Sequence, residues 1–159
     1  MGTNFDDVGD FHERFGLDNV THSRAWPRNP DAELLEFRAK FLAEELGEFV
    51  AACTGHDARE VAKIFIDVVD TAFGAVIEID EAEAFDALID LAYVTFGTAQ
   101  LMGFPWQDGW DEVQRANMTK VRALRAEEST RLSTFDVVKP EGWQAPNIAS
   151  VLRKNGWDV

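Results

Sequence analysis

Apolar residues recur at helical spacing over residues 31–53. Advancing by about 100° per residue from a zero at Phe41 collects the apolar side chains into one broad arc, from about −40° to about 140°. The members of this arc are Leu34, Phe37, Phe41, Leu42, Leu46 and Phe49. Asp31 is a suitable N-cap for this helix, and Gly55 is a suitable stop. We therefore expect a long helix whose apolar arc faces a core.

Carboxylates interrupt this arc. Glu45 falls at about 40° and Glu48 at about −20°, both inside the arc, while Glu44 lies at its edge. An ionised carboxylate in an apolar interface costs several kcal/mol unless a partner compensates it. One interpretation is an ion pair with Arg38, which falls at about 60° on the same arc. The other is a hard divalent cation shared by closely spaced carboxylates.

A second acidic helix is predicted over residues 81–102, ended by Gly103 and Pro105. Its large apolar residues point nearly all round the axis, which is typical of a buried helix. On this apolar background Glu83, Asp86 and Asp90 fall within about 60° of one another.

The remaining periodic segments complete an all-α pattern. They comprise a helix over residues 4–15 stopped by Gly16, a helix from about Asp57, a helix over about 108–127, β-like residues at 134–138, and a last helical turn at 148–154. In the helix over 108–127, Asn117 lies at the centre of the apolar stripe and Lys120 at its edge. We predict one domain over residues 1–159. It is a bundle of four to five main helices, with core helices over about 31–127 and a short irregular or β-like tail over about 128–159.

Charge and composition narrow the classes of partner. The chain carries 15 basic and 29 acidic residues, a net charge of −14, which disfavours binding to nucleic acid or to an anionic membrane. No apolar run is long enough to span a bilayer, and the acidic N-terminus is unlike a secretory signal. The single cysteine, Cys53, excludes an internal disulfide. We expect Cys53 to be buried and the protein to be cytoplasmic.

Two helices that each place carboxylates on an apolar face favour a metal site. Carboxylate oxygens suit Mg²⁺ or Mn²⁺, and the absence of His and Cys from these faces disfavours zinc. The chain has no Gly-rich phosphate loop followed by Lys-Ser or Lys-Thr, no nucleophile elbow and no Glu-x-x-His pair.

Several segments resemble one known family. They are Glu44-Glu45-x-x-Glu48, Asp10-Phe11-His12-Glu13-Arg14-Phe15-Gly16, residues 86–99 with Asp86-Ala87-Leu88-Ile89-Asp90 at their start, residues 112–120, and the tail from Lys139 to Pro146. In this order they resemble the all-α nucleoside triphosphate pyrophosphohydrolases, the MazG-like and phosphoribosyl-ATP pyrophosphohydrolase-like group.

The resemblance implies Mg²⁺-dependent hydrolysis of a (deoxy)nucleoside triphosphate, of dUTP or dGTP type for example, to the monophosphate and pyrophosphate. It implies that Glu45, Glu48, Asp86 and Asp90 hold the metal and that Glu44 assists the metal or the attacking water. It further implies that Asn117 and Lys120 contact the phosphates, and that the chain forms a homodimer or homotetramer. Phe11, His12 and Trp106 are candidates for a base pocket by their aromatic character alone.

The second acidic helix departs from the family pattern. The common pattern there is Glu-x-x-Asp, but the glutamate position before Asp90 is Ala87, so we assign the role to Asp86. Glu83-x-x-Asp86 is a competing register. Two other functions stay open: phosphoribosyl-ATP pyrophosphohydrolase, and a non-catalytic helical oligomer that binds metal or a partner.

Overall fold

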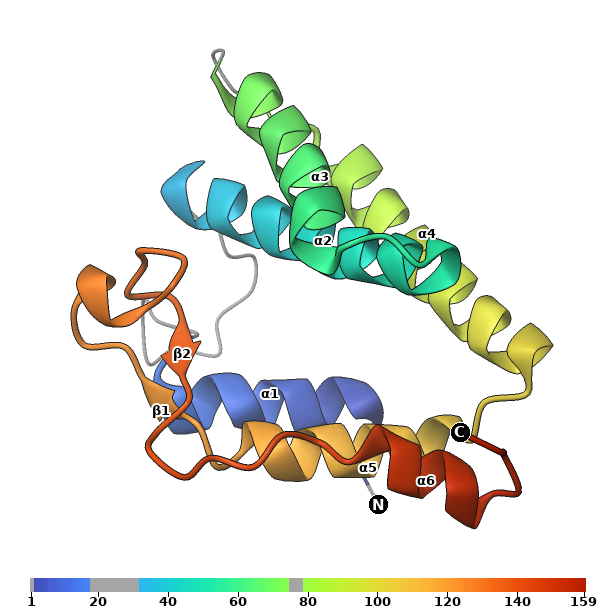
Figure 1. Cartoon of the computed structure of the whole chain (residues 1–159). Coiled ribbons are helices and arrows are strands. Elements are labelled where there is room, and N and C mark those ends of the chain that lie inside the picture. The colour runs from blue at the N-terminus through green and yellow to red at the C-terminus, as the bar shows by residue number, and fades with distance from the viewer. Residues whose placement is uncertain (1, 18–31, 75–78) are drawn as a thin grey trace. The chain divides into compact units, whose positions relative to one another are not determined.

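The computed structural model describes residues 2–17, 32–74 and 79–159 and confirms the all-α class. The helices are α1 (Asn4–Phe15), α2 (Ala32–Thr54), α3 (Ala58–Phe73), α4 (Glu81–Met102), α5 (Trp106–Asn117) and α6 (Ile148–Lys154), as Figure 1 shows. Two short strands, β1 (Val121–Arg122) and β2 (Val137–Val138), flank a 3₁₀ turn at Ala126–Glu128. The predicted cap Asp31 lies outside the described residues.

The chain divides into two compact units, each described here by itself. One unit combines residues 1–22 with 80–159, and the other comprises residues 23–79. The α2–α3 pair therefore forms the second unit, and all other elements belong to the first.

In the second unit, α2 and α3 pack through small residues. Gly47 and Ala51 of α2 and Ala62 of α3 are buried, and a Cβ on Gly47 would lie 2.5 Å from the Ala62 Cα. Only glycine permits this approach of the two backbones. Beside this contact, the Lys40 ammonium of α2 reaches the Asp70 carboxylate of α3. The location of the small residues thus determines which face of α2 meets α3.

That face differs from the arc predicted to line the core. On the angular scale used above, Gly47 lies at about −120° and Ala51 at about −80°. The arc residues Leu42, Leu46 and Phe49 are exposed instead. The predicted burial of the whole arc is wrong in this structure, because the close approach at Gly47 places α3 against the side of small residues and not against the arc. Cys53 is also exposed, contrary to expectation.

In the first unit, α1 lies along α5 (Figure 1). The Trp110 indole Nε1 donates to the Asp7 carboxylate over 2.8 Å, and the Gln114 amide donates to the Asp7 carbonyl over 3.0 Å. Arg122 donates to the carbonyl of Gly16, which ends α1 in the left-handed region at φ 59°. Three polar contacts therefore tie α1 to α5 and β1.

The helix predicted over 108–127 is shorter than expected and starts two residues earlier. It spans Trp106–Asn117, after which Val121 pairs with Val138 and Arg122 with Val137 in an antiparallel bridge. This pairing uses residues that are distant in sequence, so helical periodicity alone does not detect it. The predicted β-like tail is confirmed at β2, and the last helical turn at α6.

The bounds of α4 agree with the prediction, whereas its burial does not. Asp80 caps the helix through the amides of Ala82 and Glu83, and Gly103 ends it at φ 71°. Ala99 is the buried residue of the helix, while apolar side chains along it are exposed. These exposed residues are Phe85, Leu88, Ile89, Leu91, Tyr93, Val94, Phe96, Leu101 and Met102. The pattern predicts a buried helix, whereas these side chains are exposed in the part of the chain that the structure describes.

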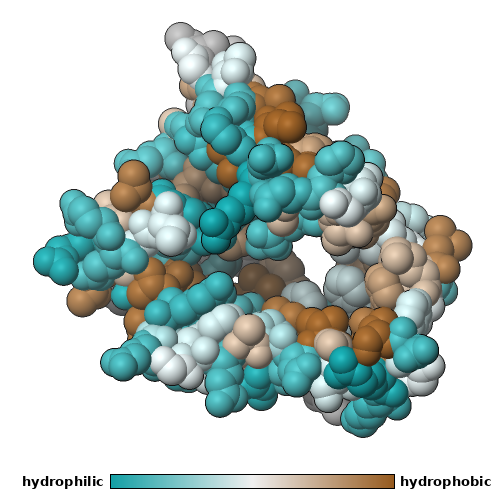
Figure 2. All heavy atoms as spheres, viewed as in Figure 1, coloured by the Kyte–Doolittle hydropathy of each residue, from teal (hydrophilic) through white to brown (hydrophobic). Residues whose placement is uncertain are grey.

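Apolar side chains reach the surface of both units, as the brown spheres in Figure 2 show. None of the described helices combines the length and the apolar character needed to cross a membrane.

Candidate functional site

The first acidic group lies on α2, away from α3. Glu45 is exposed and lies about 160° round the helix from Gly47, on the side opposite to the α3 contact. Glu48, one turn further on, is also exposed, whereas Glu44 is half-buried. Glu45 and Glu48 stand three residues apart, a spacing that places both on one side of a helix. The packing at Gly47 thus leaves both carboxylates exposed on the side of α2 that faces away from α3.

The second acidic group lies on the first half of α4. Glu83, Asp86 and Asp90 are all exposed, and the helix is regular through them. Spacings of three and four residues keep them on one face, which is the condition for shared coordination of a cation. Because all three are accessible, either register of the pair, Glu83 with Asp86 or Asp86 with Asp90, remains a prediction.

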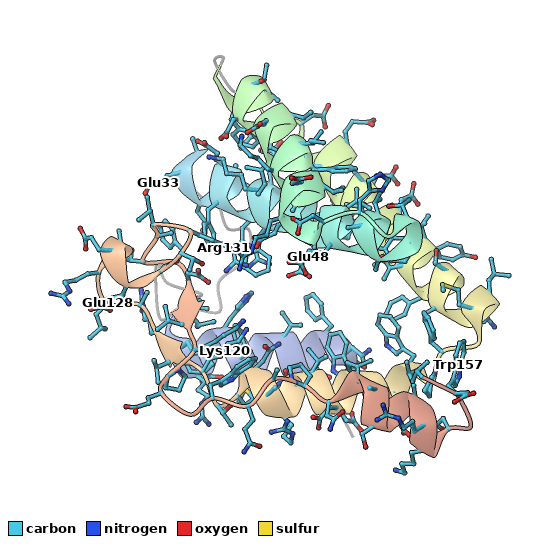
Figure 3. All side chains as sticks on the ribbon, viewed as in Figure 1. Glu33, Glu48, Lys120, Glu128, Arg131 and Trp157 are labelled. Atoms are coloured by element: carbon cyan, nitrogen blue, oxygen red, sulfur yellow. The ribbon has the colours of Figure 1, made fainter. Side chains whose placement is uncertain are left out.

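The two acidic groups belong to different units. Figure 3 labels Glu48 from the α2–α3 unit and Lys120 from the other unit. Within the described ranges no group of three His, Cys, Asp or Glu side chains is gathered into a metal site. The donor set itself fits Mg²⁺ or Mn²⁺, since each group offers accessible carboxylate oxygens at helical spacing and no sulfur or imidazole.

The candidate phosphate contacts lie at the end of α5. Asn117 is the last helical residue, and its carbonyl accepts the Lys120 amide over 3.1 Å in the turn that follows. Lys120 is therefore in a turn and not at the edge of a helical stripe, because the helix has already ended. Its ammonium nitrogen lies 5.7 Å from the centre of the Trp143 ring.

Comparison with known proteins identifies the group to which the chain is related. A family model described as phosphoribosyl-ATP pyrophosphohydrolase matches residues 8–117, which is more than half of the chain. The chain belongs to the phosphoribosyl-ATP pyrophosphohydrolase family. Neither the search of curated proteins nor that of solved structures found a match.

This phosphoribosyl-ATP pyrophosphohydrolase family is part of the MazG-like all-α superfamily, so the expected resemblance is confirmed. Membership makes the chain a pyrophosphohydrolase that acts on a nucleotide-like substrate. The matched residues include both acidic groups and Asn117, and they end three residues before Lys120.

The aromatic candidates for a base pocket all lie in the first unit of this family member. Phe11 packs against the rings of His12 and Phe15 within α1. Trp106, at the start of α5, packs edge-on against Phe96 with ring centres 4.7 Å apart. Its buried Nε1 has no hydrogen-bond partner among the described residues. These ring contacts explain the packing of the aromatic residues but not the unpartnered Nε1 of Trp106, and their role in a base pocket remains a prediction.

Sequence analysis did not detect the polar contacts that attach α6 to α5. The Glu112 carboxylate accepts a hydrogen bond from the backbone N–H of Asn147 over 2.8 Å and also pairs with Arg115. These bonds lower the pKa of Glu112 to about 2, and the Arg115 side chain contributes most. At the other end of α6, the side-chain amide of Asn155 donates a hydrogen bond to the Asp108 carboxylate over 2.9 Å. The sequence shows an Asn at each end of this short helix, but residue spacing does not indicate that Glu112 and Asp108 are their hydrogen-bond partners.

Proposed function

We propose that the protein hydrolyses (deoxy)nucleoside triphosphates to the monophosphate and pyrophosphate, with Mg²⁺ as cofactor. The observation that carries this proposal is the family match over both acidic helices. The exposed position of Glu45 and Glu48 on α2 supports it, because the packing against α3 leaves both carboxylates accessible to a cation and a substrate.

Each acidic residue has a role in the proposed reaction. Glu45 and Glu48 on α2, with Asp86 and Asp90 on α4, would hold the metal. Bound Mg²⁺ neutralises phosphate charge and lowers the pKa of a coordinated water. Glu44, half-buried at the edge of the group, is assigned to orient the attacking water and accept its proton.

Asn117 and Lys120 complete the proposed site on the phosphate side. An amide and an ammonium both donate hydrogen bonds to phosphate oxygens, and the lysine adds a compensating positive charge. In a chain with a net charge of −14, such local cations are needed beside the metal to hold a triphosphate.

Phosphoribosyl-ATP is the second candidate substrate, and the family match supports it equally. A panel of triphosphates and phosphoribosyl-ATP, assayed for pyrophosphate release with and without Mg²⁺, separates the two. Release from a common triphosphate at high kcat/KM supports our proposal, whereas release from phosphoribosyl-ATP alone contradicts it. Inactivity on every substrate would favour the non-catalytic oligomer.

We further propose that the protein works as a homodimer or homotetramer. Apolar side chains on α4 are exposed in the single chain, with Leu101 at 91% and Tyr93 at 78%. An apolar surface of this extent is typical of an interface between chains. Light scattering that gives the mass of a monomer over a range of concentrations would contradict this part of the proposal.

A further inference from the structure

Two lysines meet at one tryptophan in the tail of the first unit. The Lys120 ammonium lies 5.7 Å and the Lys139 ammonium 4.9 Å from the centre of the Trp143 ring. The two nitrogens are thus no farther apart than the sum of these distances. The whole chain has five lysines, so the pairing of two of them in a strongly acidic protein needs an explanation.

Backbone pairing brings these lysines together. Val121 of β1 lies opposite Val138 of β2 in an antiparallel register. In this register the next residues outward are Lys120, before β1, and Lys139, after β2. The pairing therefore places residues 19 positions apart in the chain opposite each other.

Trp143 is fixed independently of the lysines. Its indole Nε1 donates to the Ala116 carbonyl over 3.0 Å, and its backbone amide donates to the Pro140 carbonyl over 3.0 Å. Ala116 is fully buried, so this bond holds the indole against a buried residue of α5. The fixed aromatic ring then attracts both ammonium groups by the cation–π interaction.

The charge arrangement favours a polyanionic ligand. Two ammonium groups beside one ring concentrate positive charge in an otherwise acidic chain, and an anion carrying several charges complements such a cluster. Lysine is a common phosphate ligand because it acts as a point charge with three donors. Lys139 is exposed and therefore accessible to such a ligand.

We propose that Lys139 is a second phosphate-contacting residue, which together with Lys120 binds the polyphosphate chain of the substrate and is positioned by Trp143. This inference rests on the proposed function, since it assumes the same substrate. Lys139 and Trp143 lie beyond the residues that match the family, 8–117, so the family match does not assign them this role.

Three lysine variants test the inference. Lys139→Met removes the charge and keeps the apolar stem, Lys139→Arg keeps the charge, and Lys154→Met on α6 is the control, an exposed lysine outside this cluster. We expect Lys139→Met to raise KM for the triphosphate about tenfold with kcat changed less than about twofold, the effect of losing one charged hydrogen bond in binding. Lys139→Arg restores the parent KM, and Lys154→Met leaves it unchanged.

Binding of inorganic tripolyphosphate, measured by calorimetry, separates this inference from the proposed function. Weaker binding to Lys139→Met than to the parent and to Lys154→Met supports the inference, even if the parent hydrolyses none of the nucleotides tested. Active enzyme with unchanged KM and unchanged tripolyphosphate affinity in Lys139→Met overturns the inference and leaves the proposed function intact. A parent that releases no pyrophosphate overturns the proposed function, and equal tripolyphosphate affinities then overturn the inference as well.

Discussion

Helices α2 and α4 are similar in length and general composition and differ in how they are packed. Both are long, both are rich in apolar residues, and both carry acidic residues at helical spacing. Gly47 gives α2 a close-packed partner in α3, whereas a Cβ added at Gly97 of α4 would meet no atom of the described residues within 4 Å. Apolar periodicity therefore predicts that a helix is covered, but small residues at a contact decide which face is covered and by what.

Alanine substitution at Gly47 and at Gly97 should give the largest difference in stability between the two helices. Gly47→Ala places a Cβ 2.5 Å from the Ala62 Cα, so the backbones must separate, at a cost of about 1–3 kcal/mol in the free energy of unfolding. Gly97→Ala enters open space and gains about 0.5–1 kcal/mol from helix propensity. Chemical denaturation of both variants measures the contrast. Equal destabilisation of the two would contradict it and would indicate a second chain packed against Gly97.

Polar substitutions on α4 test whether its exposed apolar side chains form the proposed interface between chains. Ile89 and Tyr93 lie one turn apart and are 53% and 78% exposed, so the double variant Ile89→Ser with Tyr93→Ser disturbs little within the chain. We expect it to keep its helical circular dichroism and to dissociate the proposed oligomer, seen as a lower mass by light scattering. Loss of helicity without a change in mass would indicate that these side chains support the chain itself.

The ion pair between α2 and α3 contributes less than the glycine contact. Lys40 donates hydrogen bonds to the carboxylates of Asp70 and Glu36, and these bonds raise the pKa of Lys40, the bond to Asp70 contributing most. Because the Lys40 and Asp70 side chains are 34% and 49% exposed, Lys40→Met should cost less than about 1 kcal/mol in unfolding free energy. Lys63→Met, which removes a pair within α3, is the control. A larger loss in Lys40→Met than in Gly47→Ala would reverse the proposed order of the two contacts.

The smallest expected effect is the pH dependence of the polar contacts that attach α6 to α5. The packing of α2 against α3 through small apolar residues has no such dependence. The pKa of Glu112 lies at about 2, below its ordinary value of 4.5, so its stabilising contribution is complete above pH 4.5 and is lost as the pH falls towards 2. Trp157 follows α6 and packs against Phe104, so its fluorescence reports the attachment. Glu112→Gln should flatten the fluorescence change over this pH range, and an unaltered acid transition would contradict the assignment.

Local signals predicted most helix ends correctly. Gly16 ends α1, and Gly103 ends α4, both in the left-handed region where glycine is favoured. Asp57 caps α3 through the amides of Arg59 and Glu60. These features depend on neighbours in sequence, and they are therefore visible in the sequence itself.

Features that depend on distant residues were not predictable. The end of α5 is set by strand pairing between Val121 and Val138, and the packed face of α2 by the contact of Gly47 with Ala62. The positions of Glu45 and Glu48 on an accessible face of α2 are consistent with the predicted metal site, whose assembly from both acidic helices remains a prediction. The proximity of Lys139 to Trp143 arises from the tail, which helical periodicity does not describe.

The central proposal is that the outer carboxylates of α2, Glu45 and Glu48, hold the metal needed for the pyrophosphohydrolase reaction. Its most direct test is Mg²⁺-dependent pyrophosphate release by the parent, by Glu48→Gln and by Glu33→Gln, a control at an exposed glutamate in the first turn of the same helix. We predict that Glu48→Gln lowers kcat/KM by about a hundredfold or more, while Glu33→Gln keeps the parent value. Parent activity in Glu48→Gln would contradict the account.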